Sequence, residues 1–157
     1  MKAVVITVSD RVSRGEAEDL SGPAAAALLP GWGFDATVRV VPDGVDSVSA
    51  ALRSAIDEGV NLVVTTGGTG VAPRDQTPEA TLAVVDRLAP GLSEAIRSAT
   101  FGTHPHGMLS RGVSGIAGST LIVNLPGSPA AVEESLRVIG SSLRHAVALI
   151  VGDPTEH

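Results

Sequence analysis

The feature of this sequence that most constrains its fold is the alternation of short apolar runs with segments of helical periodicity. Ala3–Val8 is a continuous apolar, β-rich run, typical of a strand covered on both faces. Further strands are predicted at 36–41, 61–65, 112–116 and 120–124. Helices are predicted to begin at Ser21, Ser47, Thr77, Pro90 and Ser128. Residues 102–109 show no periodicity and are predicted to form a loop. The alternation implies parallel pairing with right-handed crossovers. We therefore predict an α/β fold, a three-layer α/β/α sandwich around a mostly parallel sheet, with the 112–124 pair as a candidate antiparallel element.

Length and composition limit the classes of protein that this chain can belong to. The 157 residues contain no internal repeat or linker, so we expect a single domain over 1–157. Aromatic residues make up 2 % of the chain and the net charge is −6, which argues against a nucleic-acid partner. The absence of cysteine excludes disulfides and thiolate catalysis. The apolar run at the N-terminus is too short for a signal peptide or a membrane span, so we expect a soluble, cytoplasmic protein with no membrane partner.

Polar clusters follow four of the predicted strands, at the point where each strand ends. The clusters are Ser9-Asp10-Arg11, Pro42-Asp43-Gly44, Thr66-Gly67-Gly68-Thr69-Gly70 and Asn124-Leu125-Pro126-Gly127-Ser128. In an open parallel sheet, ligands bind in the crevice beyond the carboxyl ends of the strands. We therefore expect all four clusters to face one cleft.

The segment from Thr65 to Pro78 reads TTGGTGVAPRDQTP and is the strongest candidate for anion binding. Its closely spaced glycines leave backbone amides open to a phosphate. The string matches neither the P-loop nor the dinucleotide fingerprint, and Lys2 is the chain's one lysine. Arg74 offers a cation for phosphate, and Asp75 offers a carboxylate for a metal or a substrate donor. The alternative is a glycine-rich turn followed by an acid that favours the helix dipole.

Two further segments are candidates for substrate binding. Pro126-Gly127-Ser128 places free amides at the start of a long helix, suited to an anion or a nucleotide edge, although Ser128 is also an ordinary N-cap. Ser110-Arg111 is suited either to an anionic group or to a neighbouring carboxylate.

Structural alternatives stay open for several other polar residues. Asp10 also fits a turn residue paired with Arg11, and Asp43 fits a common turn acid. Asn124 also fits a strand cap. His104 and His106 lie in a proline-broken segment with no third ligand nearby in the sequence, which favours a solvated loop over a metal site.

The order of motifs resembles the molybdopterin adenylyltransferases, the MogA/MoaB-like proteins of molybdenum cofactor synthesis, which are related to the G domain of gephyrin. The resemblance covers nearly the whole chain. It rests on Ser9-Asp10-Arg11 with Asp19-Leu20-Ser21-Gly22, TTGGTG…RDQTPEA (Thr65 to Ala80), Pro90-Gly91 with Glu94 and Arg97, Leu109-Ser110-Arg111, and Asn124-Leu125-Pro126-Gly127-Ser128-Pro129.

This resemblance implies a reaction and a set of site residues. The reaction is ATP plus molybdopterin giving adenylylated molybdopterin and pyrophosphate, with Mg²⁺. Asp43 and Asp75 match the family's two essential acids, and Asp43 is the candidate metal ligand. Thr66–Gly70 match its phosphate-binding segment, Ser110 and Arg111 match part of the pterin site, and Asn124–Ser128 match the segment that lines the nucleotide pocket.

The resemblance also implies a homo-oligomer, a trimer or a hexamer, with a downstream molybdenum insertase as a candidate partner. Two other functions stay open from the sequence. One is hydrolysis of nucleotide pyrophosphates, and the other is a non-catalytic module that binds or delivers molybdopterin. Because both acids and the whole glycine loop are present, the sequence favours the transferase.

Overall fold

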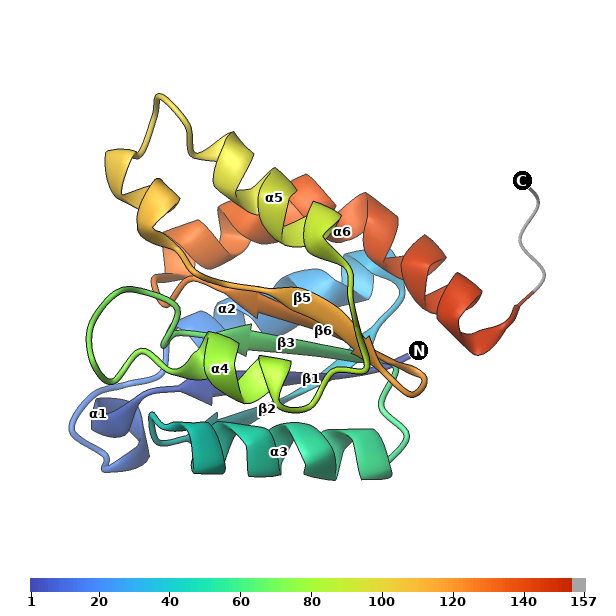
Figure 1. Ribbon diagram of the computed structural model, residues 1–157, viewed down its shortest axis with the longest axis horizontal. Coiled ribbons are helices and arrows are strands. Elements are labelled where there is room, and N and C mark those ends of the chain that lie inside the picture. The colour runs from blue at the N-terminus through green and yellow to red at the C-terminus, as the bar shows by residue number, and fades with distance from the viewer. Residues whose placement is uncertain (154–157) are drawn as a thin grey trace.

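A six-stranded sheet forms the centre of the fold, which the computed structural model describes for residues 1–153 (Figure 1). The strands are β1 (Lys2–Val8), β2 (Asp35–Val41), β3 (Leu62–Thr66), β4 (Arg87–Leu88), β5 (Ser114–Ala117) and β6 (Thr120–Leu125). Their order in the sheet is β2-β1-β3-β6-β5-β4. The first four strands in this order are parallel, whereas β5 runs antiparallel to both β6 and β4. The mostly parallel sheet with an antiparallel element is confirmed.

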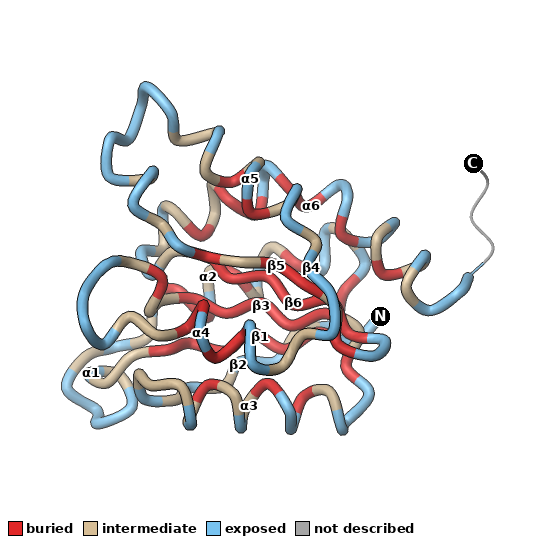
Figure 2. The backbone as a smooth tube through the Cα atoms, in the orientation of Figure 1, coloured by how far each residue is buried: buried red, intermediate tan, exposed pale blue. Residues whose placement is uncertain are grey.

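Helices cover both faces of the sheet, as predicted. They are α1 (Asp10–Ser13), α2 (Ser21–Leu28), α3 (Val45–Asp57), α4 (Thr77–Leu82), α5 (Pro90–Ala99) and α6 (Pro129–Val151), with 3-10 turns η1 (Leu29–Trp32) and η2 (Pro105–Leu109). α2, α5 and α6 pack on one face around side chains such as Val64 and Val123. α3 and α4 pack on the other face around Val63 and Ile122. Figure 2 shows the buried residues gathered in the sheet between these two layers.

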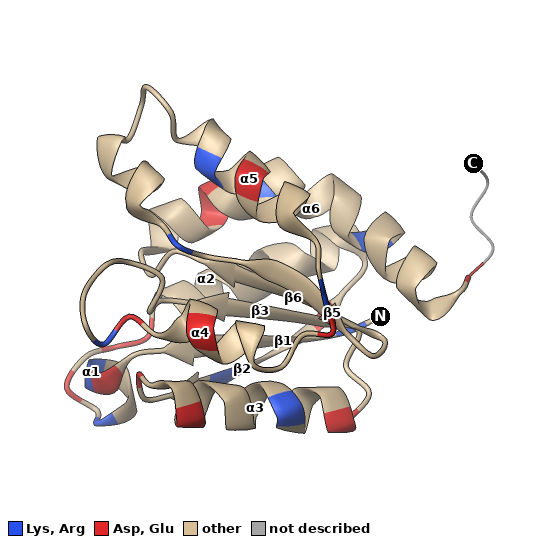
Figure 3. Ribbon diagram, viewed as in Figure 1, with Lys and Arg blue, Asp and Glu red and all other residues tan. Residues whose placement is uncertain are grey.

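Charged residues lie outside the centre of the sheet. Figure 3 shows them on the helices, on loops at both ends of the sheet and on outer strands such as β2, and neither β3 nor β6 contains one. Burying a charge without a partner is costly, which explains why the central strands consist of apolar residues, threonine and one asparagine. In residues 1–153 no helix is both long enough and apolar enough to cross a membrane.

The structure differs from the sequence prediction in its shortest elements. Three elements were not predicted: the single-turn helix α1, the 3-10 turn η1 and the two-residue strand β4. The predicted loop over 102–109 contains the 3-10 turn η2. Elements of two to five residues carry too few positions to show a period of 2 or 3.6, so these differences come from the length of the elements.

Gly140 marks a tight contact between α6 and η1. A Cβ atom at this glycine would stand 2.2 Å from Cε2 of Trp32. Alanine is usually the better helix residue, by about 1 kcal/mol. Here we expect Gly140→Ala to lower the free energy of unfolding by about 1–3 kcal/mol, because the indole must shift.

Denaturant unfolding followed by the fluorescence of Trp32, the chain's one tryptophan, measures this change. Gly91→Ala is the matched control, because no atom lies within 4 Å of its Cβ position. A Gly140→Ala protein as stable as the wild type would show that the contact is loose.

Candidate active site

A pocket of about 600 Å³ opens at the carboxyl ends of β3 and β6. Loops after these strands, the start of α6 and the segment after α5 supply its walls. From the sequence-predicted set it brings together Gly67, Gly68, Thr69, Gly70, Asp75, Ser110, Pro126, Gly127 and Ser128. Ser128 is the N-cap of α6, and its hydroxyl accepts a hydrogen bond from the amide of Ala131 at 3.3 Å. Its predicted capping role is confirmed, and it also lines the pocket.

The turn after β3 requires glycine for reasons of backbone geometry. Gly67 and Gly68 have φ angles of 92° and 64°, in the left-handed region that favours glycine. A Cβ at Gly67 would stand 2.4 Å from the carbonyl oxygen of Val8. Thr77, at the start of α4, holds the turn from the other side: its hydroxyl donates to the Gly67 carbonyl and its amide to the Gly68 carbonyl, both at 3.0 Å. The loop is thus a fixed structure that presents backbone to the pocket.

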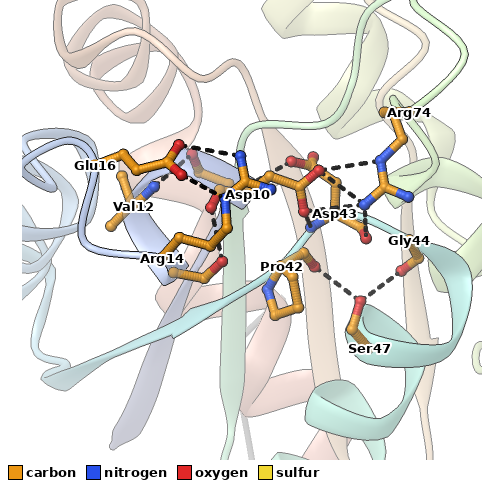
Figure 4. Close-up of polar contacts among 11 residues, drawn as sticks. Asp10, Val12, Arg14, Glu16, Pro42, Asp43, Gly44, Ser47 and Arg74 are labelled. Carbon is orange, nitrogen blue, oxygen red and sulfur yellow. Dashed lines mark hydrogen bonds and ion pairs between the residues drawn. The ribbon is translucent and has the colours of Figure 1, made fainter.

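Asp10 and Asp43 join the ends of β1 and β2 through a reciprocal pair of hydrogen bonds (Figure 4). The Asp10 amide donates to Oδ2 of Asp43 at 2.8 Å, and the Asp43 amide donates to Oδ1 of Asp10 at 3.1 Å. Arg74 binds both carboxylate oxygens of Asp10 through Nη2, at 2.9 and 2.8 Å, and donates to the Asp43 carbonyl oxygen at 2.9 Å. Asp10 therefore pairs with Arg74, and the alternative pairing with Arg11 is wrong.

This network leaves the second carboxylate oxygen of Asp43 beside the glycine loop. Oδ1 of Asp43 lies 3.3 Å from where a Cβ of Gly68 would be. Two residues further along the loop, Oδ2 of Asp75 lies 2.7 Å from the Cβ position of Gly70 and accepts a hydrogen bond from the Ala72 amide at 2.9 Å. Two carboxylates thus flank the glycines. Residues 1–153 contain no group of three or more His, Asp or Glu side chains placed to hold a metal ion.

Arg111 binds the far side of the glycine loop. Its Nε donates to the Gly70 carbonyl at 2.7 Å, and its other nitrogens donate to the Asp75 carbonyl and to the carboxylate of Glu79. Of the two predicted roles for Arg111, the structure shows the contact with a neighbouring carboxylate. Arg111 lowers the pKa of Glu79 by hydrogen bonding to it. Because this pKa is lower in the folded protein, the pair's stabilising effect is present at neutral pH and is lost as the pH falls below glutamate's ordinary range.

Asn124 lies inside the protein and does not line the pocket. It is 3 % exposed, its amide nitrogen donates to the hydroxyls of Thr65 and Thr81 at 3.0 and 2.9 Å, and its oxygen accepts from the Val113 amide at 3.2 Å. A buried amide with its hydrogen bonds made internally joins β3, α4 and β6.

We therefore expect Asn124→Ala to act on stability. Each buried polar group that loses its partner costs about 1–3 kcal/mol in the free energy of unfolding. Urea unfolding measures the loss, and nucleotide affinity of the folded variant provides the second measurement. A variant of normal stability that binds nucleotide more weakly would instead assign Asn124 to the ligand.

A second, smaller pocket lies on the other side of Gly67 and Gly127, which line both. Its volume is about 300 Å³, and it contains Ser9 and Thr66 from the predicted set. Ser9 caps α1 by accepting from the Val12 amide at 3.3 Å, and the buried Thr66 hydroxyl lies 3.0 Å from that of Ser21. Asp19, which also lines this pocket, was not among the predicted site residues; it accepts from the Thr7 hydroxyl at 2.7 Å.

Sequence reasoning also missed the outer wall of the larger pocket. This wall includes Ile96, Thr100, His104, His106, Leu109 and Glu134. The helical spacing of α6 was a signal for Glu134, because it follows Ala130 by four residues and therefore lies on the same face of the helix. Nothing in the sequence placed the segment after α5 over that face.

Comparison with known proteins gives one consistent result. The family model described as "Probable molybdopterin binding domain" matches residues 4–145. A Helicobacter pylori (strain J99) protein named molybdopterin adenylyltransferase is 39 % identical over 95 % of this chain and 87 % of its own length. The Drosophila melanogaster molybdenum cofactor synthesis protein cinnamon is 43 % identical over 95 % of this chain, which spans 25 % of that longer protein.

Solved structures agree. The crystal structure of the molybdopterin biosynthesis enzyme MoaB from Thermus thermophilus superposes with a TM-score of 0.92 at 43 % identity, covering 99 % of both chains. A family model that matches most of the chain, and close relatives in sequence and in structure, lead to the same conclusion. The chain belongs to the molybdopterin-binding domain family.

Proposed function

We propose that this protein is a molybdopterin adenylyltransferase of molybdenum cofactor biosynthesis, which transfers AMP from ATP to the terminal phosphate of molybdopterin. One observation of the structure carries the proposal. Glycine amides, a helix N-terminus and the carboxylate of Asp75 line one pocket, together with apolar side chains such as Ile96 and Leu109. Such a pocket suits a phosphate at one end and a ring system at the other. The name of the Helicobacter pylori relative supports the same reaction.

The reaction requires little covalent chemistry from the protein itself. An oxygen of the molybdopterin phosphate attacks the α-phosphorus of ATP. The new P–O bond forms as the bond from the α-phosphorus to the α–β bridging oxygen breaks, and pyrophosphate leaves with that oxygen. Catalysis then depends on alignment of the two substrates and on stabilisation of the charge at the transferring α-phosphate. Gly67–Gly70 and the first turn of α6 supply fixed amides for this purpose. Arg74 and Arg111 are each paired with a carboxylate. We therefore assign Arg74 to the positioning of Asp10, and Arg111 to the positioning of the glycine loop.

The carboxylates beside the loop fit Mg²⁺. This ion prefers oxygen ligands and is usually held by one or two carboxylates together with substrate phosphates. Oδ1 of Asp43 faces the glycine loop, whereas its Oδ2 is held by the Asp10 amide. We assign Asp43 to the metal and Asp75 to the alignment of the substrates. A bound Mg²⁺ would neutralise charge on the ATP phosphates.

We also propose the organisation of the protein. Residues 1–157 act as one domain, in the cytoplasm, as a trimer or a hexamer that supplies a downstream molybdenum insertase. Exposed large apolar side chains, among them Leu88, Leu149 and Val151, favour self-association. Light scattering at micromolar concentration is expected to give a mass above that of the 15.8 kDa monomer, and a purely monomeric protein would contradict this.

Pyrophosphate release from ATP and Mg²⁺, measured with and without molybdopterin, tests the proposed reaction. We expect release that requires molybdopterin, and one adenylylated molybdopterin formed for each pyrophosphate. Phosphate-bond cleavage that proceeds equally well without molybdopterin would indicate a nucleotide pyrophosphate hydrolase. Molybdopterin binding without turnover would indicate a scaffold module.

A further inference from the structure

One carboxylate of the larger pocket has no role in the reaction described so far. Among the described residues that line this pocket, the acids are Asp75 and Glu134. Asp75 lies beside the glycine loop, whereas Glu134 lies in the second turn of α6. Glu134 lies six positions after Ser128, which corresponds to about 9 Å along the helix axis. Glu134 therefore lies at the end of the pocket away from the phosphate-binding amides.

One part of the pocket wall is apolar. This part consists of the side chains of Ile96, Leu109, Ala130 and Ala131. Among the described residues that line the pocket, Asp75 and Glu134 are the acidic ones. A flat heterocycle can lie against such a wall, and the polar groups at its edge then need partners at the end of the pocket. Glu134 and the neighbouring His104 are polar side chains available there.

The side chain of Glu134 contacts one basic side chain. Nε2 of His104 lies 3.5 Å from its Oε2, and this is the contact of Glu134 with a basic group within residues 1–153. A carboxylate has about four lone-pair sites, so Glu134 keeps most of its capacity to accept hydrogen bonds. The adjacent Glu133 differs, because it pairs with Arg137 at 3.1 Å and does not line the pocket.

A pterin presents a matching edge. Its 2-amino-4-oxopyrimidine ring carries an exocyclic amino group next to the N3–H, two donors that point the same way. A carboxylate accepts both hydrogen bonds at once, and such paired, charge-assisted contacts give geometric specificity. We propose that Glu134 determines substrate specificity by accepting hydrogen bonds from the 2-amino and N3–H groups of the pterin ring. The inference rests on the proposed function, because it takes the ring system in the pocket to be a pterin.

A matched pair of ligands tests this assignment directly. 6-Hydroxymethylpterin and 6-hydroxymethyllumazine differ at position 2, where the amino group of the first is an oxo group in the second. Titration calorimetry of the wild-type protein is expected to show tighter binding of the pterin by about 10- to 100-fold, the range for one bidentate contact. Equal binding of the two ligands by the wild type would overturn the inference.

Glu134→Gln provides a sharper test, because an amide offers one acceptor and one donor. Its oxygen can accept from N3–H, and its NH₂ group can donate to the 2-oxo group of lumazine. We expect this variant to reverse the preference in favour of lumazine. Glu133→Gln is the matched control and should keep the wild-type preference. A uniform loss of affinity for both ligands in Glu134→Gln would mean that Glu134 only supports the wall through His104, and would overturn the inference.

Two further measurements keep this result separate from the proposed function. Thermal melting of each variant confirms that the domain is folded, which we expect because the Glu134 side chain is 40 % exposed. Molybdopterin-dependent pyrophosphate release by the wild type tests the transferase. Release together with an unchanged ligand preference in Glu134→Gln rejects the role of Glu134 and leaves the transferase standing. A reversed preference without any release rejects the transferase and leaves the pterin contact standing.

Discussion

Asp43→Asn is expected to slow adenylyl transfer by about 10²- to 10³-fold, the usual effect of removing one electrostatic contact to a transition state. Asparagine keeps the size of the side chain, and its oxygen can still accept the hydrogen bond from the Asp10 amide. Its NH₂ group then takes the place of Oδ1 beside Gly68, where a hard cation needs an oxygen. Molybdopterin affinity should change little.

Steady-state pyrophosphate release at several Mg²⁺ concentrations measures this effect, and a calorimetric titration gives the pterin affinity. Asp46→Asn is the matched control, since Asp46 is an exposed acid in the first turn of α3, three residues further along the chain. If Asp43 serves only the turn after β2, Asp43→Asn will melt at a lower temperature and turn over normally. Wild-type rates in that variant would reject the metal role.

Gly68→Ala is expected to weaken ATP binding or turnover by at least about 100-fold, the effect of losing one fixed donor to a phosphoryl group. The φ angle of 64° disfavours any side chain. A Cβ would also stand 2.3 Å from Oγ1 of Thr77 and 3.3 Å from Oδ1 of Asp43. The loop must therefore move away from both the helix that holds it and the carboxylate that faces it. The free energy of unfolding should fall by about 1–3 kcal/mol as well.

Nucleotide titration of the folded variant separates the effect on binding from the effect on stability. Gly91→Ala, at a helical position with open space at its Cβ, should leave ATP binding at its wild-type value and should not lower the free energy of unfolding. An unchanged ATP dissociation constant together with an unchanged rate of pyrophosphate release in folded Gly68→Ala would show that this turn is merely structural.

The sequence was sufficient for the long elements of the fold. The apolar runs at β1, β3 and β6 and the capped start of α6 follow from local pattern, and the carboxyl-edge position of the glycine loop follows from the parallel sheet. α1 and β4 were not predicted, because elements of four and two residues are too short to show a helical or strand period in their apolar residues.

The partners of the polar side chains could not be predicted, because they depend on tertiary packing. Arg74 lies 64 positions after Asp10, its ion-pair partner. The hydrogen-bond partners of Asn124 depend on tertiary packing as well. The strand pattern predicts its place at the end of a strand, but not which side chains lie beside it. Its amide is satisfied by threonines from β3 and α4, so a residue that was expected at the pocket is part of the core. For Glu134 the difficulty was the opposite. Helical spacing predicts the face of α6 on which it lies, but nothing in the sequence predicts that this face lines the pocket.

The glycines that line both pockets also limit how the protein's ligand preference can be redesigned. The Cα of Gly127 lies 4.0 Å from the Cβ position of Gly67, so the partition between the two cavities is bare main chain. Main chain offers no side chain to exchange, and an added Cβ would press on backbone, at 2.4 Å from the Val8 carbonyl oxygen for Gly67 and at 3.2 Å from the Cα of Gly67 for Gly127. A library aimed at altered pterin or nucleotide analogues should therefore vary the outer walls, at positions such as Ile96 and Leu109 for one cavity and Val12 for the other, and leave the partition untouched.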